Sequence, residues 1–138
     1  MTILDTNVVS ALMNDSPDEQ VVSWLNRQPE SSIWMSSITI FEIEFGLQIM
    51  PAGRRRTALA HRFAHTLGEM ERRIAVFDED AARETASLMA MRQKKGLVRD
   101  LRDSMIAGIV LSRHASLATR NLTHFADIAA AVVNPWAA

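Results

Sequence analysis

The sequence lacks cysteine, which excludes disulfide bonds, zinc–thiolate sites and cysteine nucleophiles. Glycine and proline are scarce, with five and four residues, and they occur singly. The chain therefore shows neither a flexible linker nor a glycine-rich phosphate-binding loop. No apolar run approaches the roughly 18 residues of a membrane span, and Asp5 interrupts the first apolar residues too early for a secretory signal. We expect a cytoplasmic protein without a membrane segment.

The charges are nearly balanced, with 15 Lys and Arg against 16 Asp and Glu and a net charge of -1. This balance excludes a strongly basic nucleic-acid coat protein but leaves room for local basic patches. Hydrophobic residues make up 48% of the 138 residues and charged residues 22%, which excludes a disordered chain. We therefore expect one domain, residues 1–138, with one packed architecture.

Short apolar segments alternate with amphipathic ones. We predict strands at residues 2–4, 32–36, 74–77, 116–118 and 129–133, and helices at 8–13, 18–28, 38–50, 53–70, 80–95 and 102–114. The segment 38–50 also alternates as a strand would, but its length and Gly46 favour a helix. The alternation predicts an α/β fold whose parallel sheet is covered on both faces, with functional residues beyond the carboxyl ends of the strands.

Four oxygen-bearing residues lie where such a site would form. Asp5 and Asn121 each follow a predicted strand, and Asp103 lies in the first turn of a predicted helix. Glu42 falls within a helix face otherwise made of apolar residues, where an ionised carboxylate is costly unless it is paired or binds a cation. No Lys or Arg lies near Glu42 in the sequence. Together the four residues form a set of hard oxygen ligands, which Mg²⁺ and Mn²⁺ prefer.

Each of these residues also has a purely structural interpretation. Asp5 could cap the helix that follows it, and Asp103 could do no more than complement a helix dipole. Asn121 is of a type common in turns and caps. Glu42 would lie at the rim if the helix face were assigned one residue off. The metal-site hypothesis therefore rests on the four residues taken together.

Two basic clusters could meet a polyanion. The first, at residues 54–56, is of the kind that usually forms a solvated helix face. The second flanks Asp103 and is better placed to contact a phosphate backbone near the acids; it comprises Lys94, Lys95, Arg99 and Arg102. The four histidines lack a zinc-site spacing, since the pair His61 and His65 has no intervening carboxylate of the H-E-x-x-H kind.

Short motifs spread over nearly the whole chain resemble the PIN-domain family, specifically the VapC- and FitB-type toxins of bacterial toxin–antitoxin pairs. Their order, spacing and the total chain length carry the resemblance. The motifs are Leu4-Asp5-Thr6-Asn7, Ile40-Phe41-Glu42-Ile43, Asp103-Ser104-Met105-Ile106, Thr119-Arg120-Asn121 and Asn134-Pro135-Trp136.

The resemblance implies a three-layer PIN-like sandwich, with about five parallel strands between helices, and a Mg²⁺- or Mn²⁺-dependent ribonuclease. It implies that Asp5, Glu42 and Asp103 are catalytic and ligate the metal, with Glu42 as a ligand or as the base for the attacking water. Asn121 stands where many relatives have a fourth acid. Asp100 competes for the role of Asp103, but Asp103 directly precedes the matching helix start.

By the same resemblance, Thr6 and Thr119 line the pocket. The implied partners are RNA as substrate, a VapB- or FitA-like antitoxin, operator DNA reached only through that antitoxin, and a second copy in a homodimer. Two alternatives stay open: a catalytically weak PIN-fold binding module, for which Asn121 argues, and a phospho-acceptor α/β domain. A haloacid-dehalogenase sequence of the latter kind would need an acid where Asn7 stands.

Overall fold

The computed structural model describes residues 1–138 and is built around five parallel strands. They pair in the order β3-β2-β1-β4-β5. Each neighbouring pair is parallel, and Leu4 in β1 is in register with Met35 in β2 and Ala118 in β4. The carboxyl ends of the three central strands therefore meet at one edge of the sheet. The strands are β1 (Thr2–Leu4), β2 (Ile33–Ser36), β3 (Ile74–Ala75), β4 (Ser116–Ala118) and β5 (Val132–Val133).

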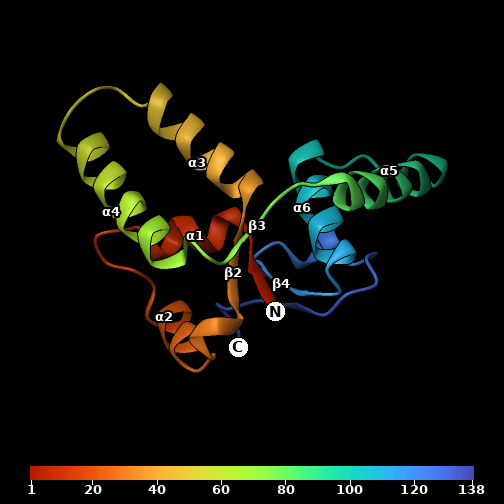
Figure 1. Cartoon of the computed structure of the whole chain (residues 1–138), viewed down its shortest axis with the longest axis horizontal. Helices are drawn as coiled ribbons and strands as arrows, with labels where there is room; N and C mark the ends of the chain where they lie inside the picture. The colour runs from red at the N-terminus through yellow and green to blue at the C-terminus, as the bar shows by residue number, and fades with distance from the viewer.

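Six α-helices and two short 3₁₀ helices connect the strands. Figure 1 shows how the α-helices lie around the sheet. The helical prediction for residues 38–50 is confirmed by α3. Gly96 has φ of +70° just beyond α5, the left-handed conformation with which glycine commonly ends a helix. The helices are α1 (Thr6–Leu12), α2 (Glu19–Asn26), η1 (Glu30–Ser32), α3 (Ser37–Ile49), α4 (Arg54–Met70), α5 (Glu79–Lys94), α6 (Leu101–Ser112) and η2 (Leu122–Phe125).

Two apolar cores lie on opposite faces of the sheet, because successive strand residues point to opposite sides. Ile3 and Leu117 belong to the core covered by α5 and α6, whereas Leu4 and Ala118 belong to the core covered by α1, α2 and α4. All four side chains are at most 2% exposed. This arrangement confirms the predicted three-layer α/β sandwich.

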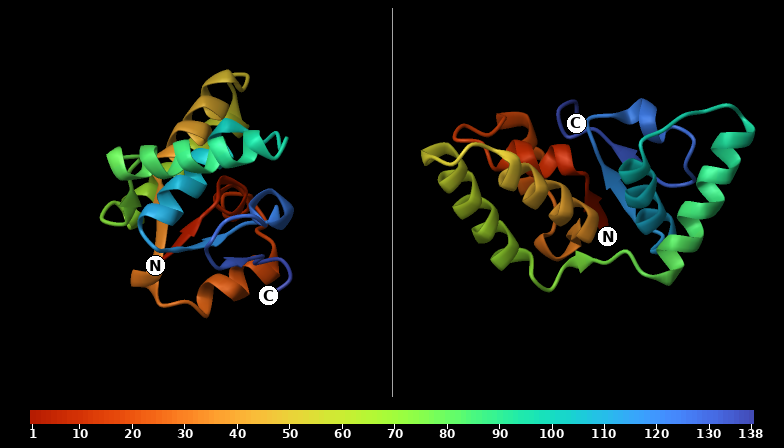
Figure 2. Two further views of the ribbon diagram at one scale, coloured as in Figure 1. Left: turned by 90° about the vertical axis from the view of Figure 1, so that its right-hand side faces the viewer. Right: turned by 90° about the horizontal axis from the view of Figure 1, so that it is seen from above.

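The helices form two groups that diverge from the sheet. Figure 2 shows α3 and α4 together on one side and α5 and α6 on the other. Within the second group, α6 is almost fully buried over Ile106–Val110, as its apolar sequence predicts. None of the helices combines the length and apolar composition that a bilayer crossing requires.

The structure corrects the sequence predictions in three places. Strands β3 and β5 are only two residues long, shorter than predicted at 74–77 and 129–133. The two 3₁₀ helices, η1 and η2, have no counterparts among the predicted elements. The apolar face around Glu42 is largely exposed, with Phe41 at 54%, Phe45 at 50% and Ile49 at 68%.

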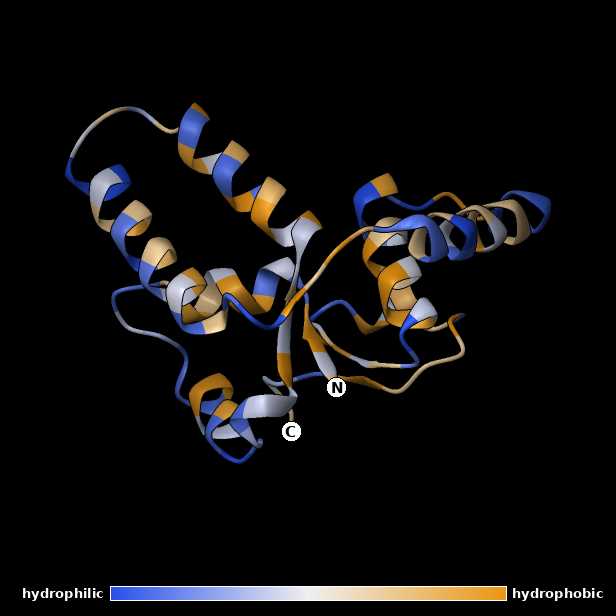
Figure 3. Ribbon diagram, viewed as in Figure 1, coloured by the Kyte–Doolittle hydropathy of each residue, from blue (hydrophilic) through white to orange (hydrophobic).

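The reason for the last difference is that α3 carries apolar residues on more than one side. Figure 3 shows hydrophobic positions recurring along its whole length. The stripe that faces the core is offset from the predicted one and includes Thr39, Ile43 and Leu47, which follow one another at helical spacing.

Candidate active site

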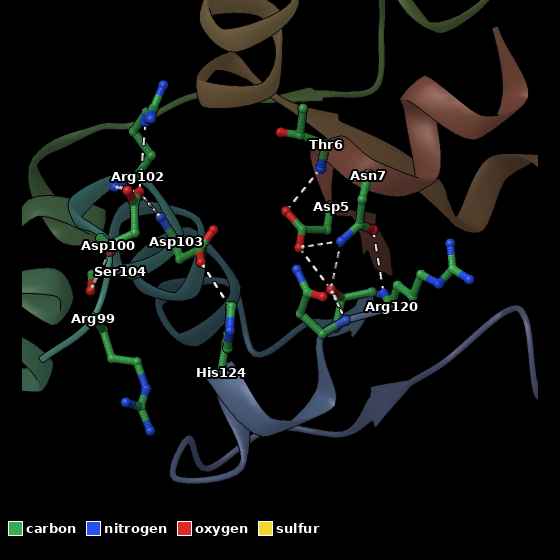
Figure 4. A network of polar contacts seen from close by, with 12 residues as sticks. Asp5, Thr6, Asn7, Arg99, Asp100, Arg102, Asp103, Ser104, Arg120 and His124 are labelled. Carbon is green, nitrogen blue, oxygen red and sulfur yellow. Dashed lines mark hydrogen bonds and ion pairs between the residues drawn. The ribbon is translucent and has the colours of Figure 1, made fainter. Parts of the chain in front are cut away.

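Asp5 lies directly after β1, at the N-cap of α1, and its side chain is almost fully buried, with the residue 3% exposed. Its carboxylate accepts hydrogen bonds from the Thr119 hydroxyl at 2.7 Å, the Thr6 backbone N–H at 2.8 Å and the Asn7 amide at 3.5 Å. Figure 4 shows this group of contacts at the carboxyl end of the sheet. Capping is therefore part of the role of Asp5, and the contact to Thr119 goes beyond it.

The electrostatic environment of Asp5 disfavours its ionised form. Burial raises the pKa of Asp5 from 3.8 to about 6, although hydrogen bonds from Thr119 and Thr6 oppose the shift. The negative charges of Asp103 and Glu42 contribute to the same upward shift. Asp103 and Glu42 are therefore close enough to act on the charge of Asp5, and a cation beside Asp5 would oppose their effect.

Glu42 is held by a chain of hydroxyl groups. The Thr6 hydroxyl donates to Glu42 Oε1 at 2.8 Å and lies 2.9 Å from the Thr39 hydroxyl, which in turn accepts from Ser36 at 3.4 Å. An ionised carboxylate only accepts, so Thr6 donates to Glu42 and Thr39 donates to Thr6. Ser36 and Thr39 are both 0% exposed, which fixes the chain in place.

A cation also approaches Glu42 from a distant part of the sequence. Arg102 Nε, in the first turn of α6, lies 4.0 Å from Glu42 Oε2 and 3.6 Å from Asp100 Oδ1. The Arg102 side chain is 44% exposed, so the pairing is partly screened by water. Arg102 therefore supplies the partner that no nearby residue of the sequence offers.

Asp100 and Asp103 take different positions at the start of α6. Asp100 is the N-cap and accepts the backbone N–H of Arg102 at 2.8 Å and of Asp103 at 3.4 Å. Asp103 lies in the first turn, and its Oδ2 is 3.3 Å from Nδ1 of His124. In Figure 4, Asp103 and His124 lie across from Asp5. Asp100 thus has a capping role, and Asp103 is the residue that acts electrostatically on Asp5.

The remaining predicted pocket residues divide into two groups. Thr6 and Thr119 contact the acids directly, and Thr119 is 0% exposed. Asn121 follows Thr119, and its backbone N–H donates to the Thr119 hydroxyl at 3.1 Å. The Asn121 side chain is exposed and makes no hydrogen bond within the protein. A ligand role for Asn121 stays a prediction.

Of the second basic cluster, Arg102 alone contacts a predicted acid. Lys94 and Lys95 are exposed at the end of α5. Arg99 donates from Nη1 to the carbonyl of Val98 at 3.0 Å, and its Nε is buried without a partner. The cluster therefore extends from the acids toward the far end of α5 rather than surrounding them.

The donor set suits Mg²⁺ or Mn²⁺, although no three acidic or histidine side chains converge into a ready-made metal group. All candidate ligands offer oxygen, which these hard cations prefer. The buried Asp5 carboxylate has hydrogen-bond donors but no cationic side chain among its partners. Asp5, Asp103 and Glu42 are the residues that could hold such an ion, since the charges of Asp103 and Glu42 both act on the buried Asp5 carboxylate.

Sequence reasoning missed three residues of this site. The Asn7 amide donates to Thr119 at 3.3 Å, while its carbonyl oxygen accepts the Arg120 N–H at 3.3 Å, so it joins the ends of β1 and β4. Sequence spacing could have indicated two of these residues, since Asn7 lies two residues after Asp5 and Thr39 lies about one helical turn before Glu42. His124 carries no such signal, because its spacing in the sequence relates it to none of the acids.

Comparison with known proteins identifies the family. The chain matches the PIN domain over residues 2–131. It belongs to the PIN-domain family. It is 37% identical over 137 residues to VapC ribonuclease Y4jK of Sinorhizobium fredii, covering 99% of this chain and 98% of that protein. It is 30% identical to toxin FitB of Neisseria gonorrhoeae, covering 99% of both chains.

A solved structure extends the likeness to the whole PIN fold. The structure of FitAB bound to an IR36 DNA fragment superposes with a TM-score of 0.89 at 31% identity, covering 99% of this chain and 96% of that chain. The chain is therefore a relative of the VapC and FitB toxins along nearly its full length.

Proposed function

We propose that this PIN-domain protein is a Mg²⁺- or Mn²⁺-dependent endoribonuclease and the toxin of a toxin–antitoxin pair, acting in the cytoplasm. The observation that carries the proposal is the buried carboxylate of Asp5, whose pKa is raised to about 6 in the presence of Asp103 and Glu42. A cluster of repelling carboxylates at the carboxyl edge of a parallel sheet is suited to a divalent cation. The likeness to VapC ribonuclease Y4jK supports RNA as the substrate.

In this proposal, Asp5 and Asp103 contact the metal, and Glu42 either contacts it or accepts the proton of the attacking water. A divalent ion bound there would supply a water of lowered pKa and would neutralise charge on the scissile phosphate. Thr119 and Thr6 hold the carboxylates of Asp5 and Glu42 in fixed orientations through their hydroxyl groups. The water oxygen would form the new bond to phosphorus while the bond to the leaving ribose oxygen breaks, and that oxygen would take up a proton from solvent.

The basic residues near α6 serve substrate binding. Arg102 is half exposed beside Glu42 and can contact a phosphate of the RNA backbone. Lys94, Lys95 and Arg99 continue the positive charge away from the acids, along the path that a single strand would follow. Their contribution is independent of base sequence and decreases with salt.

Asn121 favours a second candidate function, a PIN-fold binding module with weak catalysis. An amide offers a metal only a dipolar oxygen where a carboxylate would offer a full charge. The exposed, unpaired side chain of Asn121 leaves the amide free to reach a ligand. Metal-dependent cleavage of RNA separates the two candidates, because the binding module retains RNA affinity without turnover.

The test is cleavage of single-stranded RNA by the purified chain with EDTA, and after Mg²⁺ or Mn²⁺ is added back. We expect cleavage only with the metal, and a loss of at least about a hundredfold in Asp103→Asn. Wild-type rates in that variant and in Asp5→Asn would refute the site. Phosphate transfer to the chain from a small phosphodonor, without RNA cleavage, would instead support the phospho-acceptor alternative.

We further propose a VapB- or FitA-like antitoxin as partner. A cationic side chain of that antitoxin would occupy the negative potential of the acids and so compete with the metal. The likeness to FitAB, whose structure is solved bound to an IR36 DNA fragment, supports an assembly with DNA. We propose that operator DNA is reached only through the antitoxin. The net charge of -1 gives this chain itself no general attraction to DNA.

A homodimer is proposed from the exposed face of α3. Phe41 and Phe45 stack with ring centroids 6.2 Å apart, and both are at least half exposed, as is Ile49. Three large apolar side chains on one helix face are typical of a protein–protein contact. Light scattering at micromolar concentration should give twice 15.4 kDa for the wild type and a shift toward monomer for Phe45→Asp. A purely monomeric wild type would count against the dimer.

A further inference from the structure

Arg92 is the largest side chain that is fully buried in the molecule, with 2% of the residue exposed. Its guanidinium makes a two-pronged contact with Asp127, from Nε to Oδ2 at 2.8 Å and from Nη2 to Oδ1 at 2.9 Å. Nη1 donates to the Ser104 hydroxyl at 3.0 Å, and Nη2 donates to the carbonyl of His124 at 3.1 Å. We call these four residues the Arg92 clamp. It joins α5, α6 and the segment that follows β4.

Stability alone does not explain the clamp. Burying a guanidinium and a carboxylate costs desolvation energy, and well-packed apolar residues often replace such pairs without loss. Here each nitrogen of the guanidinium has a hydrogen-bond partner. The hydrogen bond from Arg92 lowers the pKa of Asp127, whose side chain is only 22% exposed. What an apolar residue could not provide is a fixed angle between three elements, because the planar fork of Arg sets the directions of its hydrogen bonds.

Two arms of the clamp lead to Asp103. The first ends at Ser104, the next residue in the chain, whose hydroxyl also donates to the carbonyl of Asp100 at 3.2 Å. The second ends at the backbone of His124, whose ring lies 3.3 Å from Asp103 Oδ2. One side chain therefore fixes both the first turn of α6, which carries Asp103, and the segment that contacts its carboxylate.

We propose that Arg92 is a positioning residue for the acidic site: it fixes α6 and the His124 segment relative to each other and thereby places the Asp103 carboxylate opposite Asp5. This inference rests on the proposed function, because it concerns the same acids. Replacing a residue that hydrogen-bonds to a metal ligand and so orients it typically lowers metal affinity or activity by about 10- to 100-fold. Arg92 acts through Asp103 and touches neither metal nor RNA.

The test compares two clamp variants with a control on the same helix. Arg92→Lys keeps the charge but loses the fork, and Ser104→Ala removes the arm to α6 while leaving Arg92 and Asp127 paired. Leu88→Ala is the control, since Leu88 is 6% exposed in α5 and its apolar side chain makes no hydrogen bond to the clamp. Calorimetry gives the Kd for Mn²⁺ alone, and cleavage of a single-stranded RNA gives kcat and KM.

We expect both clamp variants to weaken Mn²⁺ binding and lower kcat, by about tenfold or more in Arg92→Lys and less in Ser104→Ala, with KM for RNA within about twofold of the wild type. Leu88→Ala should lower thermal stability but keep both Kd and kcat. If the Arg92 clamp only stabilised the fold, the Kd for Mn²⁺ and kcat would stay at wild-type values in every variant that folds.

The outcomes separate this inference from the proposed function. If the wild type binds Mn²⁺ but cleaves no RNA, the ribonuclease proposal fails and the Mn²⁺ Kd of the variants still decides the role of Arg92. If the wild type binds no Mn²⁺, both proposals are refuted. Should Arg92→Lys fail to fold, Ser104→Ala decides the question, and unchanged Mn²⁺ affinity in Ser104→Ala overturns the inference.

Discussion

Replacing Asp5 with Asn should stabilise the metal-free protein while abolishing its activity. Burial, and the charges of Asp103 and Glu42, raise the pKa of Asp5 from 3.8 to about 6. At about 1.4 kcal/mol per pKa unit, keeping this carboxylate ionised costs the folded state about 3 kcal/mol. The neutral amide of the Asp5→Asn variant avoids this cost, although it loses an acceptor for Thr119 or Thr6, worth about 1 kcal/mol.

The sign of the pH dependence follows from the direction of the shift. Because the folded-state pKa is raised, the contribution of Asp5 to stability is fully present below about pH 3.8 and is lost as the pH rises through about 6. The free energy of unfolding of Asp5→Asn, relative to wild type, should therefore increase by about 2–3 kcal/mol between pH 4 and pH 8. The wild type alone should regain stability when Mn²⁺ is added at pH 8.

Urea denaturation in EDTA, at both pH values and for both proteins, measures this difference directly. RNA cleavage by Asp5→Asn at pH 8 with Mn²⁺ should be at least about a hundredfold slower than by the wild type. A variant that is less stable than the wild type at pH 8 in EDTA, or a stability difference that does not change with pH, would refute the reasoning about the buried carboxylate.

Three further predictions follow from individual residues. Asp100→Asn should keep most of the RNA cleavage activity, because Asn is also a good N-cap; loss of activity here, with retention in Asp103→Asn, would exchange the two roles. Asn121→Asp should lower the Mg²⁺ or Mn²⁺ concentration for half-maximal cleavage, and an unchanged metal titration would place Asn121 outside the ligand set. Gly108→Ala should lower the free energy of unfolding by about 3 kcal/mol, since the added Cβ would lie 2.7 Å from the backbone carbonyl of Ala81. Urea denaturation measures this loss. A loss below about 0.5 kcal/mol, which is the range of an ordinary surface substitution, would contradict that packing.

The sequence allowed most of the fold to be predicted because local patterns determine it. Hydrophobic periodicity places the helices, and the choice of a helix for residues 38–50 is confirmed by α3. The ends of β3 and β5 were less predictable, since strand length depends on pairing with β2 and β4 rather than on the residues themselves. The buried side of α3 was also beyond local reasoning, because Phe41 and Ile43 are both strongly apolar and only the tertiary packing distinguishes them.

The site was predictable to the extent that its residues follow strands or begin helices. Asp5 and Thr119 come together because β1 and β4 are neighbours in register. A parallel sheet implies that the two strand ends lie at the same edge, and the structure adds that the strands are adjacent. The partners of Glu42 were not predictable, since Arg102 reaches it from another helix across the fold. Arg92 gave no signal either, because nothing in its position within an amphipathic helix distinguishes it from a solvated Arg.

The central claim is that Asp5, Glu42 and Asp103 form one site in which a divalent ion is required for RNA cleavage. The most direct test titrates Mn²⁺ and measures, on the same preparation, its calorimetric Kd and the rate of cleavage of a single-stranded RNA. The account predicts that the half-maximal rate occurs near the Kd for the wild type, and that Asp5→Asn and Asp103→Asn lose both binding and cleavage. Cleavage that persists in EDTA, or acid variants that bind Mn²⁺ and cleave RNA as the wild type does, would contradict it.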